Sequence, residues 1–223
     1  MMNVATDKQV EAGQAIYNKY VLAAYDLFVL GVSCQLFWKC PSRRMENQYD
    51  KFVSNNHLDV GVGTGYFLDK CQFSSNKPRI ALMDLNKNSL NYTAERIVRY
   101  APETYCRNIL EPISIPAENF DSVGINFLLH CLPGKLSGKG AIFDHLKAVM
   151  HPNAVIFGST ILHVGVSPNW LAKRLMNAYN NKGVFSNLYD SAEGLKRELE
   201  VRFSDVSVEV VGCVALFSAR KLI

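Results

Sequence analysis

The chain has 223 residues, a length that suits one domain with a sizeable core. Hydrophobic residues make up 48% and charged residues 20%, which excludes a disordered chain and is typical of a globular protein. The formal net charge of +4 is mild and the basic residues are scattered, so we expect no nucleic-acid partner.

The six cysteines lie far apart, without a Cys-x-x-Cys pair, and several fall in predicted strands or helices. This favours free thiols in a reducing environment, and we expect a cytoplasmic protein. The apolar stretch 21–30 is too short to span a bilayer and contains Asp26, so no membrane association is predicted. No group of His, Cys, Asp and Glu has metal-ligand spacing, so we expect no bound metal.

Residues 1–50 have the spacing of helices, interrupted at Gly31 and Pro41, and contain no strand pattern. Apolar runs of strand length begin after Asn56. They cover residues 57–61, 79–84, 105–109, 122–128, 154–161, 205–211 and 213–219. We therefore expect an N-terminal helical lid over residues 1–50 and a domain at 51–223, within one structural unit.

Amphipathic helical stretches at 88–100 and 140–150 separate the strands, and a proline soon follows each. This alternation favours an α/β fold, a mostly parallel sheet covered by helices on both faces. Because Val211 and Gly212 join the last two strands too closely for a crossover helix, those strands must form an antiparallel hairpin. The apolar stretch between His163 and Ser191 fits a helical hairpin that turns near residues 180–183.

Three glycines follow the first predicted strand at every second position, as Gly61, Gly63 and Gly65. Glycine permits a tight turn and lets the backbone approach a ligand closely. A dinucleotide-binding loop would have its third glycine at position 66, where this chain has Tyr66. A glycine-rich turn without a ligand is the alternative interpretation.

Asp84 ends the next predicted strand, nineteen residues after Gly65. The carboxyl ends of adjacent parallel strands meet at the binding crevice of an open α/β sheet. A carboxylate there can accept hydrogen bonds from two ribose hydroxyls. The other interpretation is that Asp84 caps the helix that begins near Lys87.

These features together resemble the class I S-adenosylmethionine-dependent methyltransferases over nearly the whole chain. The resemblance implies a Rossmann-like seven-stranded sheet with an antiparallel last strand. It also implies S-adenosyl-L-methionine as cofactor and S-adenosyl-L-homocysteine as product. The cofactor-binding residues that it predicts are Asp59, Gly61, Gly63, Gly65, Asp84, Leu85, Asn108, Ile109, Asn126 and Phe127. The adenine contact is left open between the Asn108 side chain and the Ile109 backbone.

The N-terminal segment is similar to the entry helices of small-molecule methyltransferases. This similarity predicts that Tyr25 contacts the cofactor and that Trp38 contacts the acceptor. Pro41 and the pair Arg43-Arg44 depart from the pattern. An aromatic helix that packs on the sheet is an equally good interpretation for other aromatic residues of this segment.

Methyl transfer from a sulfonium requires alignment of the acceptor and, for some acceptors, removal of a proton. His130 follows the fourth strand and is the candidate general base, because an unperturbed imidazole titrates near neutrality. Its alternative role is structural. Asn126 can hold the methionine end of the cofactor or the acceptor. We also assign His163 and Tyr179 to acceptor binding, beside a mostly apolar pocket.

The resulting prediction is methyl transfer to a small, partly apolar acceptor, at oxygen, nitrogen or carbon. One rival is a non-methylating enzyme that cyclises or cleaves the aminobutyrate arm of the cofactor. Another is a methyltransferase acting on protein or RNA, or a binding module without turnover. The sequence leaves the assembly state open, and a homodimer is allowed.

Overall fold

Seven strands pair into one sheet in the computed structural model, which describes residues 34–115 and 119–222. The strand order is β3-β2-β1-β4-β5-β7-β6, and β7 runs antiparallel to both of its neighbours. The strands are β1 (Asn56–Val60), β2 (Arg79–Asp84), β3 (Glu103–Cys106), β4 (Phe120–Asn126), β5 (Met150–Ile161), β6 (Ser204–Val211) and β7 (Val214–Arg220). The predicted α/β fold with an antiparallel last strand is confirmed.

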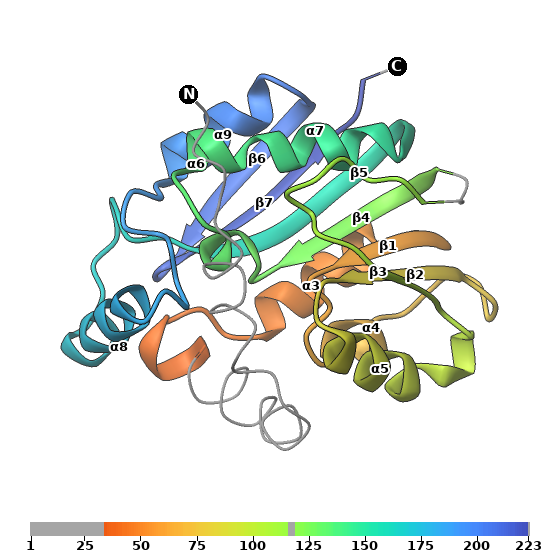
Figure 1. Cartoon of the computed structure of the whole chain (residues 1–223), viewed down its shortest axis with the longest axis horizontal. Coiled ribbons are helices and arrows are strands. Elements are labelled where there is room, and N and C mark those ends of the chain that lie inside the picture. The colour runs from red at the N-terminus through yellow and green to blue at the C-terminus, as the bar shows by residue number, and fades with distance from the viewer. Residues whose placement is uncertain (1–33, 116–118, 223) are drawn as a thin grey trace.

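Helices cover both faces of this sheet, as Figure 1 shows. The described helices are α3 (Arg43–Phe52), α4 (Tyr66–Lys70), α5 (Lys87–Arg96), α6 (Leu136–Lys139), α7 (Ala141–Ala148), α8 (Trp170–Asn181) and α9 (Ala192–Glu200). Two short 3-10 turns, η2 (Val98–Tyr100) and η3 (Leu129–Cys131), follow α5 and β4. Helices α6, α7 and α9 lie on one face, and α3, α4 and α5 lie on the other, while α8 lies beside the sheet outside both layers.

The sequence explains this layering. Strand β2 is buried at its four central positions, as expected of an interior parallel strand with apolar residues on both faces. The edge strand β6 instead has exposed residues at intervals along its length. Helix α9 begins at Ser191, whose side chain accepts a hydrogen bond from the Gly194 N–H, and it buries Leu195 and Leu199 against the sheet.

The register of the central strands brings their carboxyl ends to one edge. Asp59 of β1 pairs with Leu82 of β2 and with Gly124 of β4. The side chains at the ends of these strands, among them Asp84 and Asn126, therefore lie around a common crevice.

Several predicted bounds differ from the structure, such as the start of β5 at Met150 rather than at residue 154. The third strand ends at Cys106 rather than at residue 109, because the Asn108 side chain accepts the Leu110 N–H and turns the chain. The predicted helical hairpin is wrong. The segment between His163 and Ser191 contains a single helix, α8. Residues 182–191 follow it as an irregular loop, in which Gly183 has a φ of +72°. The polar side chains of this loop bond to other elements of the fold, as described below.

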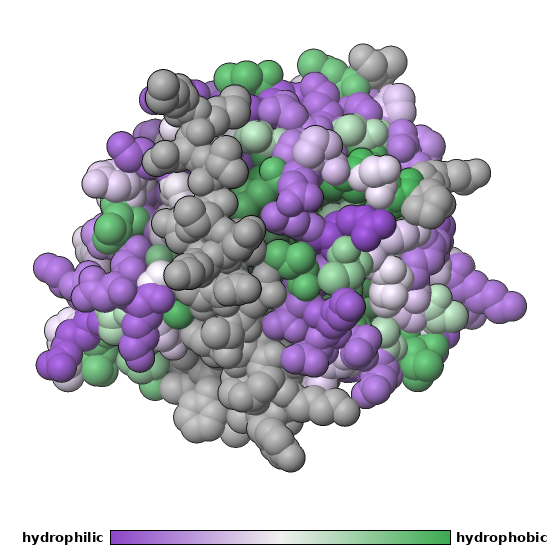
Figure 2. All heavy atoms as spheres, viewed as in Figure 1, coloured by the Kyte–Doolittle hydropathy of each residue, from purple (hydrophilic) through white to green (hydrophobic). Residues whose placement is uncertain are grey.

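Most of the predicted N-terminal lid lies outside the described residues, and the boundary at residue 50 falls within α3. Helix α3 packs against α4 and β5, so it belongs to the layer under the sheet. Among the described residues, no helix is both long enough and apolar enough to cross a bilayer. Hydrophilic and hydrophobic residues are interspersed among the coloured atoms of the face in Figure 2.

Candidate active site

Two glycines of the loop between β1 and α4, Gly63 and Gly65, are needed for different reasons. Gly65 has a φ of +69°, and a Cβ atom there would lie 2.6 Å from Cγ2 of Thr93 on α5. Gly63 has a φ of +53°, and a Cβ atom there would meet no atom within 4 Å. Gly65 therefore allows α5 to pack against the loop, whereas Gly63 borders open space that a ligand can occupy.

A cavity opens at the carboxyl ends of β1, β2 and β4. Most of the predicted cofactor-binding residues line it: Asp59, Gly61, Gly63, Asp84, Leu85, Asn108, Ile109, Asn126 and Phe127. Gly65 is not among the described residues that line it, because it packs against α5. Tyr25 lies outside the described residues. The structure thus brings together segments up to 68 residues apart in the sequence around one cavity.

Asp84 lies at the end of β2, beside the glycine loop. One carboxylate oxygen accepts the Asn86 N–H at 2.8 Å. Burial raises its pKa from the usual 3.8 to about 6, although hydrogen bonds from backbone N–H groups, including those of Val62 and Gly63, act in the opposite direction. Asn86, and not Asp84, caps α5 by accepting the Asn88 N–H. The alternative role of Asp84 as the helix cap is therefore not observed.

Two side chains contact the carboxylate of Asp59 and fix its orientation. The Tyr49 hydroxyl donates to Oδ2 of Asp59 at 2.5 Å, and Nε2 of His57 lies 3.4 Å from the same oxygen. The Tyr49 ring stacks on Phe67, with 5.3 Å between the ring centroids. Burial and the neighbouring carboxylate raise the pKa of Tyr49 well above its usual value, so its hydroxyl remains a donor. Tyr49 also lines the cavity.

Asn126 presents a polar group that lacks a partner. Its Oδ1 accepts the Ser159 hydroxyl at 2.7 Å, which fixes the orientation of the amide. Its Nδ2 is buried beside the Tyr49 hydroxyl and makes no hydrogen bond of normal geometry with the described residues. The residue lines the cavity and is 9% exposed. A buried donor without a partner lowers stability, so its position indicates a ligand with an acceptor atom.

The adenine side of the predicted site is formed by the turn after β3. Oδ1 of Asn108 already accepts the Leu110 N–H at 3.1 Å, and its Nδ2 donates to Glu111 at 3.2 Å. Ile109 is 6% exposed and belongs to the core on the side of α7. Both residues line the cavity, and their predicted contacts with the adenine stay predictions.

His130 is buried next to the cavity but is not among the described residues that line it. Its Nδ1 accepts the Ile161 N–H at 3.3 Å, and its ring lies 4.6 Å from the Phe185 ring. Burial, together with the charge of Lys139, lowers its pKa from 6.5 to about 3. These contacts favour the structural alternative, and the general-base role stays a prediction.

The three residues assigned to acceptor binding fall in two places. Trp38 and Tyr179 both pack against Phe185, with ring centroids 6.1 Å and 4.9 Å from it. His163 lies after β5, where its backbone N–H donates to the Asp190 carbonyl. None of the three is among the described residues that line the cavity. Their roles in binding the acceptor therefore stay predictions.

Sequence reasoning missed Tyr49 and the buried pair formed by Lys139 and Asp190. The buried positions Met45 and Tyr49 have the i, i+4 spacing of a helix face, which could have identified Tyr49 as a residue facing the sheet. Lys139 and Asp190 lie 51 residues apart in the sequence, and no local pattern indicates that they meet.

Comparisons with known proteins agree with this geometry. The sequence model of a methyltransferase domain matches residues 58–158. The demethylluteothin O-methyltransferase of Streptomyces thioluteus is 40% identical over 213 residues, covering 96% of this chain and 93% of that protein. The chain belongs to the class I S-adenosylmethionine-dependent methyltransferases. S-adenosylmethionine is its cofactor, and its acceptor is a small molecule.

Two further similarities extend over nearly the whole methyltransferase. The physcion biosynthesis cluster O-methyltransferase of Aspergillus chevalieri is 37% identical over 215 residues, covering 95% of this chain and 96% of that protein. The N-methyltransferase NodS of Bradyrhizobium japonicum WM9, solved with S-adenosyl-L-homocysteine, has a TM-score of 0.64 at 14% identity, covering 97% and 99% of the two chains. This last likeness supports the fold alone.

The cavity of this methyltransferase suits its cofactor chemically. Asp84 has carboxylate oxygens that can accept hydrogen bonds from hydroxyl groups such as those of a ribose, and Gly63 leaves open space beside the loop. The unpartnered Nδ2 of Asn126 can donate to a carboxylate or carbonyl oxygen.

Proposed function

We propose that this methyltransferase transfers the methyl group to a hydroxyl oxygen of a small, largely apolar aromatic acceptor. The observation that carries the proposal is the unequal polarity of the site. Asp59 and Asp84 border the cavity on the side of β1 and β2. On the side of β4, after Asn126, it is bordered by Phe127, Leu128, Leu132 and Pro133. The polar side suits a nucleoside and an amino acid, and the apolar side suits an aromatic acceptor.

The relatives support oxygen as the methylated atom, because two of them carry O-methyltransferase in their names. An aromatic cluster next to the apolar side supports an aromatic acceptor. Phe185 lies at its centre, with its ring near those of Trp38, His130 and Tyr179. These four residues are not part of the cavity lining, so the cluster supports the acceptor class by keeping the protein behind the apolar side free of water.

Within this proposal each residue of the cavity has a role toward the cofactor. Asp84 accepts the ribose hydroxyls, and the loop with Gly61 and Gly63 passes under them. Leu85 and Ile109 flank the adenine, with Asn108 at its edge. Asp59, fixed by Tyr49, and Asn126 hold the amino-acid end, and Phe127 closes the site beside the methyl group. The bound cofactor supplies an electrophilic methyl group to the acceptor oxygen.

The N-terminal part of the proposal rests on the sequence resemblance. The part of residues 1–50 that precedes α3 forms the lid, and Tyr25 within it contacts the cofactor. Trp38, Tyr179 and His163 contact the acceptor. We also propose a cytoplasmic location without nucleic-acid or membrane partners, and we retain the homodimer as the assembly to test by light scattering.

A panel of probes with one ring system tests the proposed chemistry. The purified chain is incubated with S-adenosylmethionine and 1-naphthol, 1-naphthylamine or 1-naphthalenethiol. We expect S-adenosylhomocysteine and methylated naphthol, measured by mass spectrometry, with little product from the amine. The matched control is Asp84→Ala, which should lose turnover with every probe.

Other products would contradict the proposal in different ways. Faster methylation of the amine than of the naphthol would contradict oxygen as the methylated atom. Methylthioadenosine in place of S-adenosylhomocysteine would indicate cleavage of the aminobutyrate arm. Transfer of labelled methyl to protein or RNA in a lysate, but not to any small molecule, would contradict a small acceptor.

A further inference from the structure

A loop without regular structure connects the elements around the apolar side of the cavity. Residues 185–190, here called the strap, lie between α8 and α9. Loops usually lie on the surface, yet Asn187 and Asp190 of the strap are fully buried. Buried polar side chains need partners, so the strap must be held by specific contacts.

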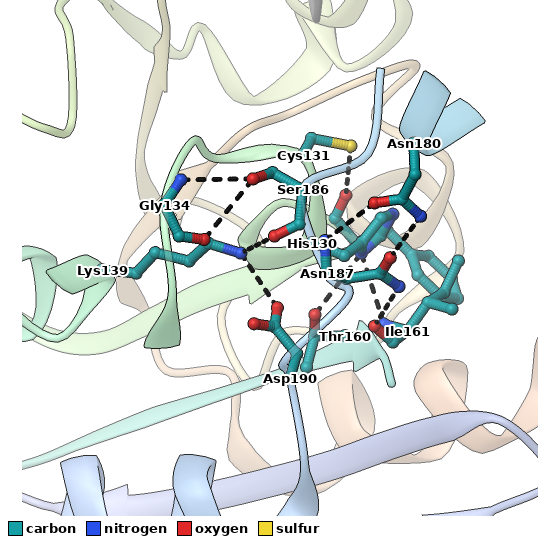
Figure 3. Close-up of polar contacts among 11 residues, drawn as sticks. His130, Cys131, Gly134, Lys139, Thr160, Ile161, Asn180, Ser186, Asn187 and Asp190 are labelled. Carbon is teal, nitrogen blue, oxygen red and sulfur yellow. Dashed lines mark hydrogen bonds and ion pairs between the residues drawn. The ribbon is translucent and has the colours of Figure 1, made fainter. Parts of the chain in front are cut away.

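The strongest of these contacts is a buried ion pair, drawn in Figure 3. Nζ of Lys139, at the end of α6, lies 2.9 Å from Oδ2 of Asp190 and 2.6 Å from the Ser186 carbonyl oxygen. Both charged side chains are 0% exposed. Oδ1 of Asp190 makes no hydrogen bond with the described residues. Burial of such a pair is costly, so its net contribution to stability is small.

The strap is also bonded to the turn that borders the cavity. The Ser186 N–H donates to the His130 carbonyl at 2.7 Å, and the Gly134 N–H donates to the Ser186 hydroxyl at 3.2 Å. Residues 127–133, here called the wall, include the cavity-lining residues Phe127, Leu128, Cys131, Leu132 and Pro133. The strap therefore supports the wall from the side opposite the cavity.

The other end of the strap is fixed to β5 and α8. Nδ2 of Asn187 donates to the Ile161 carbonyl at 3.0 Å, and Oδ1 of Asn187 accepts from Asn180 at 2.8 Å. Asn187 thus uses both ends of its amide within the fold. This leaves the Ser186 N–H and the Phe185 ring, both on His130, as the contacts between the strap and the wall, while Lys139 joins the strap to the end of α6.

The wall begins at a strained residue. Phe127 follows the last residue of β4 and has a φ of +51°, a left-handed conformation that is unfavourable for a phenylalanine. Its N–H donates to the Ser159 carbonyl, which holds one side of the turn. Such strain persists only where the surroundings impose it, and the strap provides a constraint at the other end of the wall.

We propose that Lys139 and Asp190 are positioning residues for methyl transfer, which hold the strap so that the wall keeps its place beside the acceptor. This inference rests on the proposed function, which assigns the apolar side of the cavity to the acceptor. The cofactor side depends instead on the glycine loop and Asp84. The pair should therefore affect acceptor binding and leave cofactor binding unchanged.

The variant Asp190→Asn in the full chain tests this separation. With 1-naphthol as acceptor, we expect its KM to rise about tenfold or more, because a small displacement of the wall misplaces the acceptor. The affinity for S-adenosylhomocysteine, measured by calorimetry, should stay within about twofold of that of the unmodified chain. An unchanged KM for 1-naphthol in the folded variant would overturn the inference.

A second readout needs no acceptor. The chain has two tryptophans, and Trp170 is 68% exposed whereas Trp38 is 3% exposed and packs against Phe185 of the strap. In a Trp170→Phe background, Asp190→Asn should increase acrylamide quenching of Trp38 fluorescence. Unchanged quenching would count against the strap as an ordered support. Quenching of Trp38 tests the role of the pair in holding the strap even if 1-naphthol is not methylated. Failure to methylate 1-naphthol would contradict the proposed acceptor class and not the role of the pair.

A double variant separates positioning from simple stability. Lys139→Met with Asp190→Leu removes both buried charges and retains apolar packing, so it should fold even where Asp190→Asn does not. It lacks the bond to the Ser186 carbonyl, so the KM for 1-naphthol should stay raised. A KM equal to that of the unmodified chain would show that the pair only stabilises the fold. The control is Lys196→Met with Glu200→Leu, an exposed pair on α9 that should change neither KM nor quenching.

Discussion

The two sides of the active site are built in different ways. On the cofactor side, the turns are formed by near neighbours in the sequence, such as Asp84 with Asn86 and Gly65 with Val62. On the side that we propose for the acceptor, the contacts that hold the strap join Lys139 to residues 47 and 51 positions away. A short motif can encode the first kind of site, whereas the second exists only after the chain has folded.

The two sides also differ in how their polar groups are satisfied. Asp84 and Asn126 keep hydrogen-bonding capacity toward the cavity, and Nδ2 of Asn126 lacks a described partner. Lys139 and Asp190 pair with each other, out of contact with solvent. The side bordered by Asp84 and Asn126 therefore suits a polar ligand, while the side proposed for the acceptor buries its charges and presents an apolar wall to the cavity.

The largest effect should come from filling the open space beside the glycine loop. Gly63→Leu places a side chain where a Cβ meets no atom within 4 Å, in the cavity itself. We expect the affinity for S-adenosylhomocysteine, measured by calorimetry, to fall by about a hundredfold or more, and the free energy of unfolding to fall by only about 1 kcal/mol.

The matched control for this change is Gly165→Leu. Gly165 also has a positive φ, of +78°, and open space around its Cβ position, but it is not among the described residues that line the cavity. It should lose similar stability and keep its affinity for the cofactor. Equal affinity of Gly63→Leu and the unmodified chain would contradict cofactor binding at the loop.

A smaller effect should appear as a pH dependence of cofactor binding. Burial raises the pKa of Asp84 to about 6 in the ligand-free protein, and in the proposed site the ribose hydroxyls donate to its ionised form. Affinity should therefore rise as the pH increases through 6, and should fall about tenfold per pH unit below it. Calorimetry with S-adenosylhomocysteine between pH 5 and 7 measures this slope, which Asp84→Asn should abolish.

The carboxyl of Asp84 should also make the free energy of unfolding depend on pH, in the direction opposite to that of cofactor affinity. Because the pKa of Asp84 in the folded protein lies above its usual value of 3.8, the folded state binds this proton more tightly than the unfolded state does. The contribution of Asp84 to the free energy of unfolding of the ligand-free chain should increase as the pH falls through 6. A slope that is the same in Asp84→Asn would assign both effects to another group.

The contrast between the two sides explains what could be predicted from the sequence. Strand β2 was predicted with its observed ends, Arg79 and Asp84, because its apolar run and its terminal acid are local features. The irregular course of residues 182–191 could not be predicted, because it depends on bonds from Asn187 and Asp190 to other elements. The same limit applies to Tyr49, whose role depends on contact with Asp59.

The smallest effect on turnover should follow from removal of the His130 ring. Its pKa of about 3 leaves the ring neutral between pH 5 and 8, and its Nδ1 already accepts the Ile161 N–H. We expect His130→Ala to lower kcat for 1-naphthol less than tenfold and the free energy of unfolding by about 2 kcal/mol or more. Phe185→Leu, which changes the packing on the same ring, is the matched control. A loss of two to four orders of magnitude in kcat for His130→Ala alone would instead identify His130 as the general base. The side proposed for the acceptor would then supply a proton acceptor in addition to an apolar surface.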